Sequence, residues 1–246
     1  MNWTKYSASG NDFVISHHFC HEDRGALARS LCHRQEGIGA DGLIVLLPHD
    51  TLDFEWDFYN ADGSAATMCG NGARAAAHYA YHAGLAPAQM SFLTGAGAIA
   101  AQVEGSMVET ELTAHTIAEQ DIDEAGLRWW LCDTGVPHLV AFGDLAQFES
   151  LPLSGLRQKY NANINLATIE ADTIKVRTYE RGVEGETLAC GTGMAACFLR
   201  AHEEGRVPNP CRVTPKSGEE LTLSLVKNKL HFKGAVRRVF EARLCS

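Results

Sequence analysis

Two cysteines stand at matching positions in two similar segments of the chain. Cys69 opens the segment CGNGARAAAHYAYHAG at 69–84, and Cys190 opens the segment CGTGMAACFLRAHEEG at 190–205. When the cysteines are aligned, the next glycine, the glycine two residues further on, two alanines and the last glycine are identical. Close packing of helices accounts for small residues, but it does not require a cysteine at the same first position twice. The repeat therefore indicates an internal duplication in which each copy carries one thiol.

Each cysteine precedes a Gly-rich turn that should open a helix, at about 71–83 and 192–204. Unpaired backbone N–H groups and the helix dipole make such a position electropositive, so a thiol there should ionise below its usual pKa of about 8.5. The N–H groups of Gly70-Asn71-Gly72 and Gly191-Thr192-Gly193 could also hold a carboxylate. The pattern thus combines two acid–base thiols with an anion cradle.

Two thiols on opposite faces of one carbon suit the inversion of an amino-acid stereocentre. A single base tends to return the proton to the face it came from, whereas a thiolate and an opposing thiol can remove and deliver a proton. The charge that develops spreads onto the α-carboxylate, where two helix N-termini would stabilise it. The scheme needs no cofactor, and it requires a pseudo-twofold axis that brings Cys69 and Cys190 face to face.

Six sequence blocks are spread along most of the chain: SGNDF (9–13), GIGADG (37–42), YNADGS (59–64), MCGNGAR (68–74), NIN (163–165), and YERGVEGET (179–187) followed by ACGTG (189–193). In this order they resemble the signature motifs of the diaminopimelate epimerases. The resemblance implies an α+β fold of two pseudo-symmetric lobes, each a curved mixed or antiparallel sheet around a central helix. It also implies interconversion of LL- and meso-2,6-diaminopimelate for lysine and peptidoglycan precursor synthesis, without cofactor or metal.

The same resemblance assigns roles to individual residues. Cys69 and Cys190 would be the acid and base. His138, near the reacting centre, and Glu180 would be the other catalytic residues. Glu180 would bind an ammonium group, and Arg181 would pair bidentately with the distal carboxylate of the substrate. Further substrate contacts would come from three asparagines and from the residues that open the two helices: Asn11, Asn60, Asn163, Gly70, Asn71, Gly191 and Thr192.

The chain departs from the family pattern at two positions. Gly135-Val136-Pro137-His138 stands where the family commonly has Gly-Asn-Pro-His, so one expected substrate amide is missing. Gly42 stands where some members carry a glutamine, and the chain is shorter than expected for the family. Non-catalytic explanations also exist, since His138 could be a satisfied half-buried ring and Asn11 and Asn60 could be turn formers.

Strand patterns dominate the rest of the chain. Expected strands cover 13–16, 43–47, 52–58, 98–103, 107–112, 138–142, 173–177, 221–226 and 235–242, and a further helix is expected at about 23–34. We expect an N-terminal lobe at 1–113 and a C-terminal lobe at 114–235, changing over near the polar, acidic stretch 115–126. A C-terminal strand at about 236–246 should return to the first lobe.

Composition limits the remaining possibilities. A hydrophobic content of 46% in 246 residues allows one large domain or two small lobes, and a net charge of −9 argues against a nucleic-acid surface. No apolar stretch suits a signal peptide or membrane span, so a soluble, cytoplasmic protein is expected. The absence of CxxC and HExxH patterns argues against zinc. A homodimer is expected by analogy with the family. Six cysteines are expected to be inert small hydrophobes: Cys20, Cys32, Cys132, Cys197, Cys211 and Cys245.

Two other functions remain open from the sequence. A two-cysteine racemase of the proline racemase or hydroxyproline epimerase type should share the fold and mechanism but has no need for Arg181. A thiol redox or binding protein would instead join Cys69 and Cys190 in a reversible disulfide. Exchange of a substrate α-hydrogen with solvent separates an epimerase from such a thiol protein.

Overall fold

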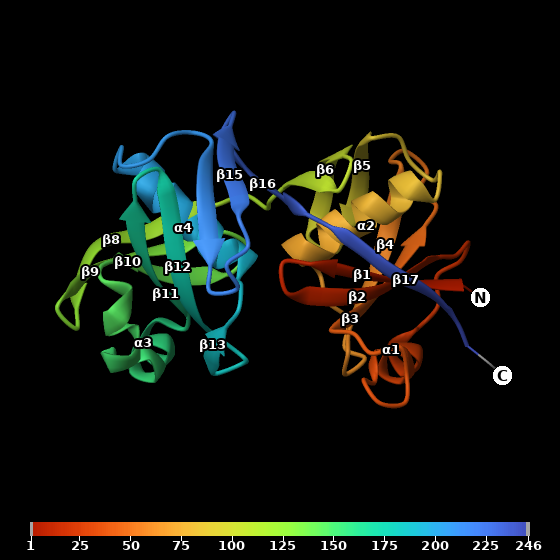
Figure 1. Cartoon of the computed structure of the whole chain (residues 1–246), viewed down its shortest axis with the longest axis horizontal. Coiled ribbons are helices and arrows are strands. Elements are labelled where there is room, and N and C mark those ends of the chain that lie inside the picture. Colours follow the sequence, from red (N-terminus) through yellow and green to blue (C-terminus); the bar gives the residue numbers. More distant parts are fainter. Residues whose placement is uncertain (1, 245–246) are drawn as a thin grey trace. The chain divides into compact units, whose positions relative to one another are not determined.

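The computed structural model describes residues 2–244, which fold into two compact units (Figure 1). The first unit consists of Met1–Glu111 and Gly234–Ser246, and the second consists of Leu112–Lys233. The units change over at 111/112 and 233/234, where the sequence placed the changes at 113/114 and 235/236. Cys245, expected to be an inert small hydrophobe, lies outside the described residues.

The first unit is a mixed β-sheet with a helix on each face. Its strands, in sheet order, are β17 (Arg237–Arg243), β1 (Asn2–Ala8), β2 (Asn11–His17), β3 (Gly42–Leu47), β4 (Phe54–Asn60), β5 (Gln89–Thr94), β6 (Gly97–Glu104) and β7 (Met107–Glu111). The pairs β2–β3 and β4–β5 are parallel, and the other pairs are antiparallel. The helices are α1 (Gly25–Cys32) and α2 (Gly70–His82).

Burial explains why these residues form this arrangement. Strand β3, with the sequence GLIVLL, is buried on both faces, as expected of a continuous apolar run between two layers. One face packs on α2, whose buried alanines allow close contact with large side chains such as Phe13, Phe58 and Phe92. The other face packs on α1 through residues such as Leu31 and Leu43. Small residues on α2 thus let strands surround it.

The second unit repeats this arrangement. Its strands, in sheet order, are β8 (Thr116–Glu124), β9 (Leu127–Asp133), β10 (Pro137–Phe142), β11 (Asn163–Glu170), β12 (Thr173–Glu180), β14 (Cys211–Pro215), β15 (Leu221–Val226) and β16 (Lys229–Ala235), with the short β13 (Gly185–Thr187) beside the end of β12. The helices are α3 (Leu153–Tyr160), α4 (Gly191–Glu203) and the 3₁₀ helix η1 (Leu145–Ser150). In β16 the chain passes from the second unit back to the first.

The core of the second unit also has two layers around its sheet. Helix α4 packs on one face, where Phe198 and Ala195 contact a cluster that includes Val176 and Phe232. The other face is covered by η1 and α3, which contribute Phe148 and Leu156. The central helix is again buried along most of its length.

The two units share one topology, which confirms the expected α+β fold of two duplicated lobes. In both units a parallel pair flanks a crossover that contains a helix, first β2–β3 and β10–β11, then β4–β5 and β12–β14 across the central helices α2 and α4. The acidic stretch 115–126, expected at the boundary, contains strand β8. Within residues 2–244, no helix combines the length and apolar character needed to cross a membrane.

Candidate functional site

In each unit, strand register gathers polar residues at the sheet end where the central helix begins. In the first unit Phe13 pairs with Gly42, and Gly42 pairs with Asn60. In the second unit His138 pairs with Asn163. Strands β11 and β12 pair Ile164 with Tyr179, the neighbours of Asn163 and Glu180 in the chain. The expected site residues therefore form two half-sites at equivalent places, one in each unit.

Cys69 caps the first central helix. Its backbone is extended, with φ −152° and ψ 117°, and its Sγ accepts a hydrogen bond from the N–H of Gly72 at 3.4 Å. Gly70 is the first residue of α2, one residue before the predicted helix start. The thiol is partly exposed, so it combines access with a position where backbone donors converge.

Asn11 and Asn71 are brought together beside this cap. The Asn71 amide donates to Oδ1 of Asn11 at 2.8 Å, and its own Oδ1 accepts from Arg74 at 3.0 Å. The Asn11 amide donates to Asp41 at 3.0 Å. These bonds set the amide orientation of both asparagines, and Asp41 and Arg74 are positioning groups that the sequence pattern did not single out.

Asn60 lies at the same end of the sheet, but its side chain is engaged within its own turn. The amide donates to Oγ of Ser64 at 3.0 Å, and its carbonyl accepts from the N–H of Gly63. The residue is exposed. Asn60 therefore takes part in its own turn, and the residue remains accessible at the surface.

Cys190 occupies the N-cap position of the second central helix, with φ −126° and ψ 108°, and is 8% exposed. Gly191 and Thr192 follow as the first residues of α4. The Oγ1 of Thr192 lies 3.6 Å from the Cys190 Sγ and 2.9 Å from Nε2 of His138. The structure therefore brings His138, Thr192 and Cys190 into one connected group.

His138 is fully buried, and burial is the main reason that its pKa falls to about 3. The positive charge of Arg181 lowers the pKa further. The ring is consequently neutral near neutral pH. A neutral imidazole can donate one hydrogen bond and accept another.

Asn163, Glu180 and Arg181 lie together at the end of β12. The Oδ1 of Asn163 accepts the backbone N–H of Arg181 at 2.7 Å, so this amide holds the chain where it leaves the strand. Burial raises the pKa of the Glu180 carboxyl above its ordinary value. The guanidinium of Arg181 donates to the carbonyl of Asn161 at 3.0 Å. Residues 2–244 provide no carboxylate in an ion pair with Arg181.

Most of the other described cysteines are buried in the cores. Cys32, Cys132, Cys197 and Cys211 are buried, whereas Cys20 is exposed, in contrast to the expected buried hydrophobe. Burial raises the pKa of Cys32 to about 11 and that of Cys132 to about 12. These buried thiols are therefore poor nucleophiles near neutral pH. In the described part of the chain, no cluster of His, Cys, Asp or Glu side chains is suited to a metal ion.

Two buried residues of the second half-site were not singled out from the sequence. Asn165 is fully buried and contacts His138, and Thr134 donates through its hydroxyl to the carbonyl of Thr192 at 2.8 Å. A signal for Asn165 was present, because it lies two residues after Asn163 and so projects from the same face of the strand.

Comparisons with known proteins agree with this arrangement. A model of the diaminopimelate epimerase family matches residues 3–115 and 130–238. The chain is 64% identical over 243 residues to a diaminopimelate epimerase of a Nitratiruptor species, covering 98% of this chain and 97% of that relative. It is 54% identical over 244 residues to a diaminopimelate epimerase of Campylobacter jejuni, covering 98% of both. The chain is therefore as long as these relatives, although it is shorter than the sequence motifs led us to expect.

Among solved structures, a hydroxyproline epimerase from Agrobacterium vitis has a similar fold. The TM-score is 0.72 at 15% identity, and the match covers 98% of this chain and 91% of the other. At this identity the likeness concerns the fold alone. The family match and the two relatives, by contrast, extend over nearly the whole sequence, and the chain therefore belongs to the diaminopimelate epimerase family of isomerases.

Proposed function

We propose that this chain interconverts LL- and meso-2,6-diaminopimelate by proton transfer between two cysteines, without a cofactor. The observation that carries the proposal is the pair of cysteine caps, Cys69 on α2 and Cys190 on α4, at equivalent places in two units of the same topology. Family membership supplies the substrate class. The reaction would serve lysine and peptidoglycan precursor synthesis in the cytoplasm.

In the proposed reaction both cysteines act on one substrate carbon. One thiolate removes the α-proton, and the opposing thiol delivers a proton to the other face, so that the two sulfurs exchange protonation states in each turnover. The electron pair left on carbon delocalises into the α-carboxylate. Backbone N–H groups at Gly70-Asn71 and Gly191-Thr192 then stabilise the developing charge.

The groups beside the caps have roles in binding diaminopimelate. Arg181 pairs with the distal carboxylate, and its freedom from an ion pair within residues 2–244 supports this assignment. Glu180 binds an ammonium group, consistent with its partly buried carboxyl at the end of β12. Asn11, Asn60 and Asn163 contribute side-chain hydrogen bonds. Val136 supplies no amide where the family commonly has Asn, so the distal end relies more on Arg181.

Hydrogen exchange at the substrate α-carbon tests this function. We expect purified protein in D₂O to incorporate deuterium at Cα of diaminopimelate while converting LL to meso isomer, and to leave proline unchanged. Cys69→Ala and Cys190→Ala should each abolish epimerisation, since each face needs a proton carrier. Cys20→Ala, at an exposed cysteine, is the matched control and should retain activity.

The outcomes separate the alternatives. Exchange of the α-hydrogen of proline or hydroxyproline but not of diaminopimelate would indicate a racemase of the proline type. Absence of exchange with any of these amino acids, together with a reversible disulfide, would indicate a thiol redox or binding protein. Full activity of either cysteine variant would contradict the two-base mechanism.

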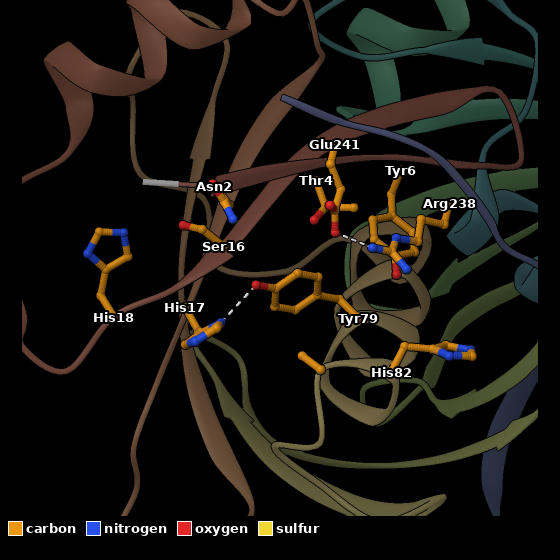
Figure 2. Close-up of a pocket in the computed structure, with 11 residues that line it drawn as sticks. Asn2, Thr4, Tyr6, Ser16, His17, His18, Tyr79, His82, Arg238 and Glu241 are labelled. Atoms are coloured by element: carbon orange, nitrogen blue, oxygen red, sulfur yellow. Dashed lines mark hydrogen bonds and ion pairs between the residues drawn. The ribbon is translucent and has the colours of Figure 1, made fainter. Parts of the chain in front are cut away.

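We also propose that the chain forms a homodimer through the free edge of β17. Strand β17 pairs with β1 on one side, and no strand within the described residues pairs with its other edge in the first unit. It exposes Val239 (42%) and Phe240 (45%), and an unpaired apolar edge favours strand addition. A cavity of about 630 Å³, lined by Tyr79, Arg238 and others, lies beside this strand (Figure 2).

Sedimentation velocity tests the dimer. Phe240→Asp should convert the protein to a monomer, because a charge would be buried in the paired edge. Val226→Asp is the matched control, since Val226 is similarly exposed at 48% but lies on β15 of the second unit. A dimer that survives Phe240→Asp, or one that only Val226→Asp disrupts, would exclude this edge.

A further inference from the structure

A chain of hydrogen bonds in the second unit connects Asn165 to Cys190. The Asn165 amide nitrogen lies 3.0 Å from Nδ1 of His138, and Nε2 of His138 lies 2.9 Å from Oγ1 of Thr192. The same Oγ1 lies 3.6 Å from the Cys190 Sγ. Three of these four residues come from different elements, β11, β10 and α4, and Cys190 is the cap of the last.

The surroundings of Asn165 define the orientation of its amide. Its Oδ1 accepts the hydroxyl of Thr178 at 2.9 Å. Its Nδ2 faces two backbone carbonyls, those of Leu139 at 3.3 Å and Asn163 at 3.4 Å, and carbonyls only accept. The nitrogen therefore points at His138, and Nδ1 of the ring must accept.

The orientation of the Asn165 amide determines which group donates in each of the following hydrogen bonds. A neutral imidazole that accepts at Nδ1 carries its hydrogen on Nε2, so His138 donates to Oγ1 of Thr192. The hydrogen of the Thr192 hydroxyl then remains for another acceptor, and the Cys190 sulfur is within reach. A thiolate is a better acceptor than a thiol, so this donor favours the ionised sulfur.

Packing around Asn165, His138 and Thr192 leaves these side chains little freedom to form other hydrogen bonds. The backbone of Thr192 is held by the Thr134 hydroxyl, which donates to its carbonyl at 2.8 Å. A Cβ added to Gly193 would lie 2.3 Å from Oδ1 of Asn165 and 3.3 Å from Cε1 of His138. The second glycine of the CGTG segment is thus required by the close approach of Asn165 to the helix start.

We propose that Asn165 and His138 are positioning residues that hold the Thr192 hydroxyl as a hydrogen-bond donor to Cys190. In this arrangement His138 supplies a fixed N–H and carries no proton in turnover. The proposal rests on the proposed function, in which Cys190 exchanges a proton with substrate, and adds the groups that prepare its sulfur. It gives His138 a positioning role in place of the catalytic role that the family resemblance implies.

The pH dependence of Cys190 alkylation by iodoacetamide, mapped by peptide mass spectrometry, tests the proposal without any substrate. Two matched pairs are compared with the wild type. Thr192→Ser keeps a hydroxyl and Thr192→Val removes it. His138→Gln keeps an N–H near the Nε2 position, and His138→Met has similar length but no donor.

We expect the donor-free variants, Thr192→Val and His138→Met, to raise the midpoint of Cys190 alkylation by about one pH unit, the loss typical of a hydrogen bond to a charged group. Thr192→Ser and His138→Gln should stay within roughly 0.3 unit of wild type, as small repositioning of a retained donor allows. Fully buried Cys197 reports unfolding in the same digest, because it should remain unmodified in a folded protein.

Two results would overturn the proposal. An unchanged midpoint in Thr192→Val would show that the hydroxyl does not donate to Cys190. An equal shift in His138→Gln and His138→Met would show that the imidazole itself is needed, as for a proton carrier. If His138→Met fails to fold, the comparison of Thr192→Ser with Thr192→Val still tests whether the hydroxyl donates to Cys190. Failure of α-hydrogen exchange in the wild type would reject the proposed function but leave the alkylation result intact, so the two failures are distinguishable.

Discussion

The buried, neutral state of His138 predicts a measurable loss of stability at mildly acidic pH. In the unfolded chain the imidazole titrates at its ordinary pKa of 6.5, whereas burial lowers the folded pKa to about 3. Between these values the unfolded state binds a proton that the folded state does not. The free energy of unfolding therefore falls as pH falls through 6.5 and continues to fall until about pH 3.

The magnitude follows from the two pKa values. On going from about pH 7.5 to about pH 5, the contribution of His138 to the free energy of unfolding falls by about 2 kcal/mol. His138→Gln cannot titrate, so the difference in stability between these pH values should be smaller in this variant by about 2 kcal/mol. His78 in the first unit has a pKa lowered to about 4, mainly by burial, so His78→Gln should remove a comparable amount independently.

Urea denaturation at the two pH values, followed by tryptophan fluorescence, measures these differences. Trp129 and Trp130 report on the second unit, and Trp3 and Trp56 report on the first. The double variant should show the sum of the two effects because the histidines lie in different units. If His138→Gln retains the full wild-type dependence on pH, the His138 imidazole takes up a proton by about pH 5 in the folded protein as well as in the unfolded chain. The argument for a fixed N–H donor then fails.

Three further predictions concern the half-sites. Gly193→Ala should lower the free energy of unfolding by about 1–3 kcal/mol through overpacking. Gly191→Ala is the matched control, because its added Cβ would approach no atom closer than 3.4 Å. In thermal melts this variant should be neutral or slightly stabilising. Arg181→Lys should reduce kcat/KM for diaminopimelate by about tenfold or more without altering the melting temperature, because an ammonium cannot pair bidentately with the distal carboxylate; unchanged kinetics would remove Arg181 from that end. Mild oxidation should join Cys69 to Cys190 and inactivate the enzyme reversibly, substrate should protect, and peptide mapping that finds another pair would contradict opposed thiols.

Local patterns were sufficient to predict the parts of the fold that depend on local chemistry. A cysteine before a Gly-rich helix start specifies a cap wherever the helix lies, so the positions of Cys69 and Cys190 at the ends of α2 and α4 followed from the repeat itself. The apolar run of β3 and the alternating pattern of β4 were also readable, because burial on two faces or on one leaves a direct mark on residue type.

Elements whose stability comes from packing were harder to predict. Strand β8 is rich in acidic residues because most of it is exposed at the edge of its sheet, so the sequence resembled a linker. Helix α3 is only eight residues long and has one fully buried side chain, Leu156, which gives a weak periodic signal. Its end is formed by Asn161 in the left-handed conformation, with φ 49°. Tertiary contacts stabilise both elements.

Short segments of the chain specify the two thiols, the helix starts that hold them and the duplicated fold, so these features were predictable from residue order. The roles of the neighbouring polar residues depend instead on tertiary packing. His138 lies 27 residues from Asn165 and 54 from Thr192 along the chain, and strand register brings the three together. Asn60, which is equally polar and precedes Cys69 by nine residues in the chain, instead bonds within its own turn. The reason is physical: a hydrogen bond is directional and short-ranged, so the partner of a buried polar group depends on packing to within a few tenths of an ångström, which residue type and spacing do not specify.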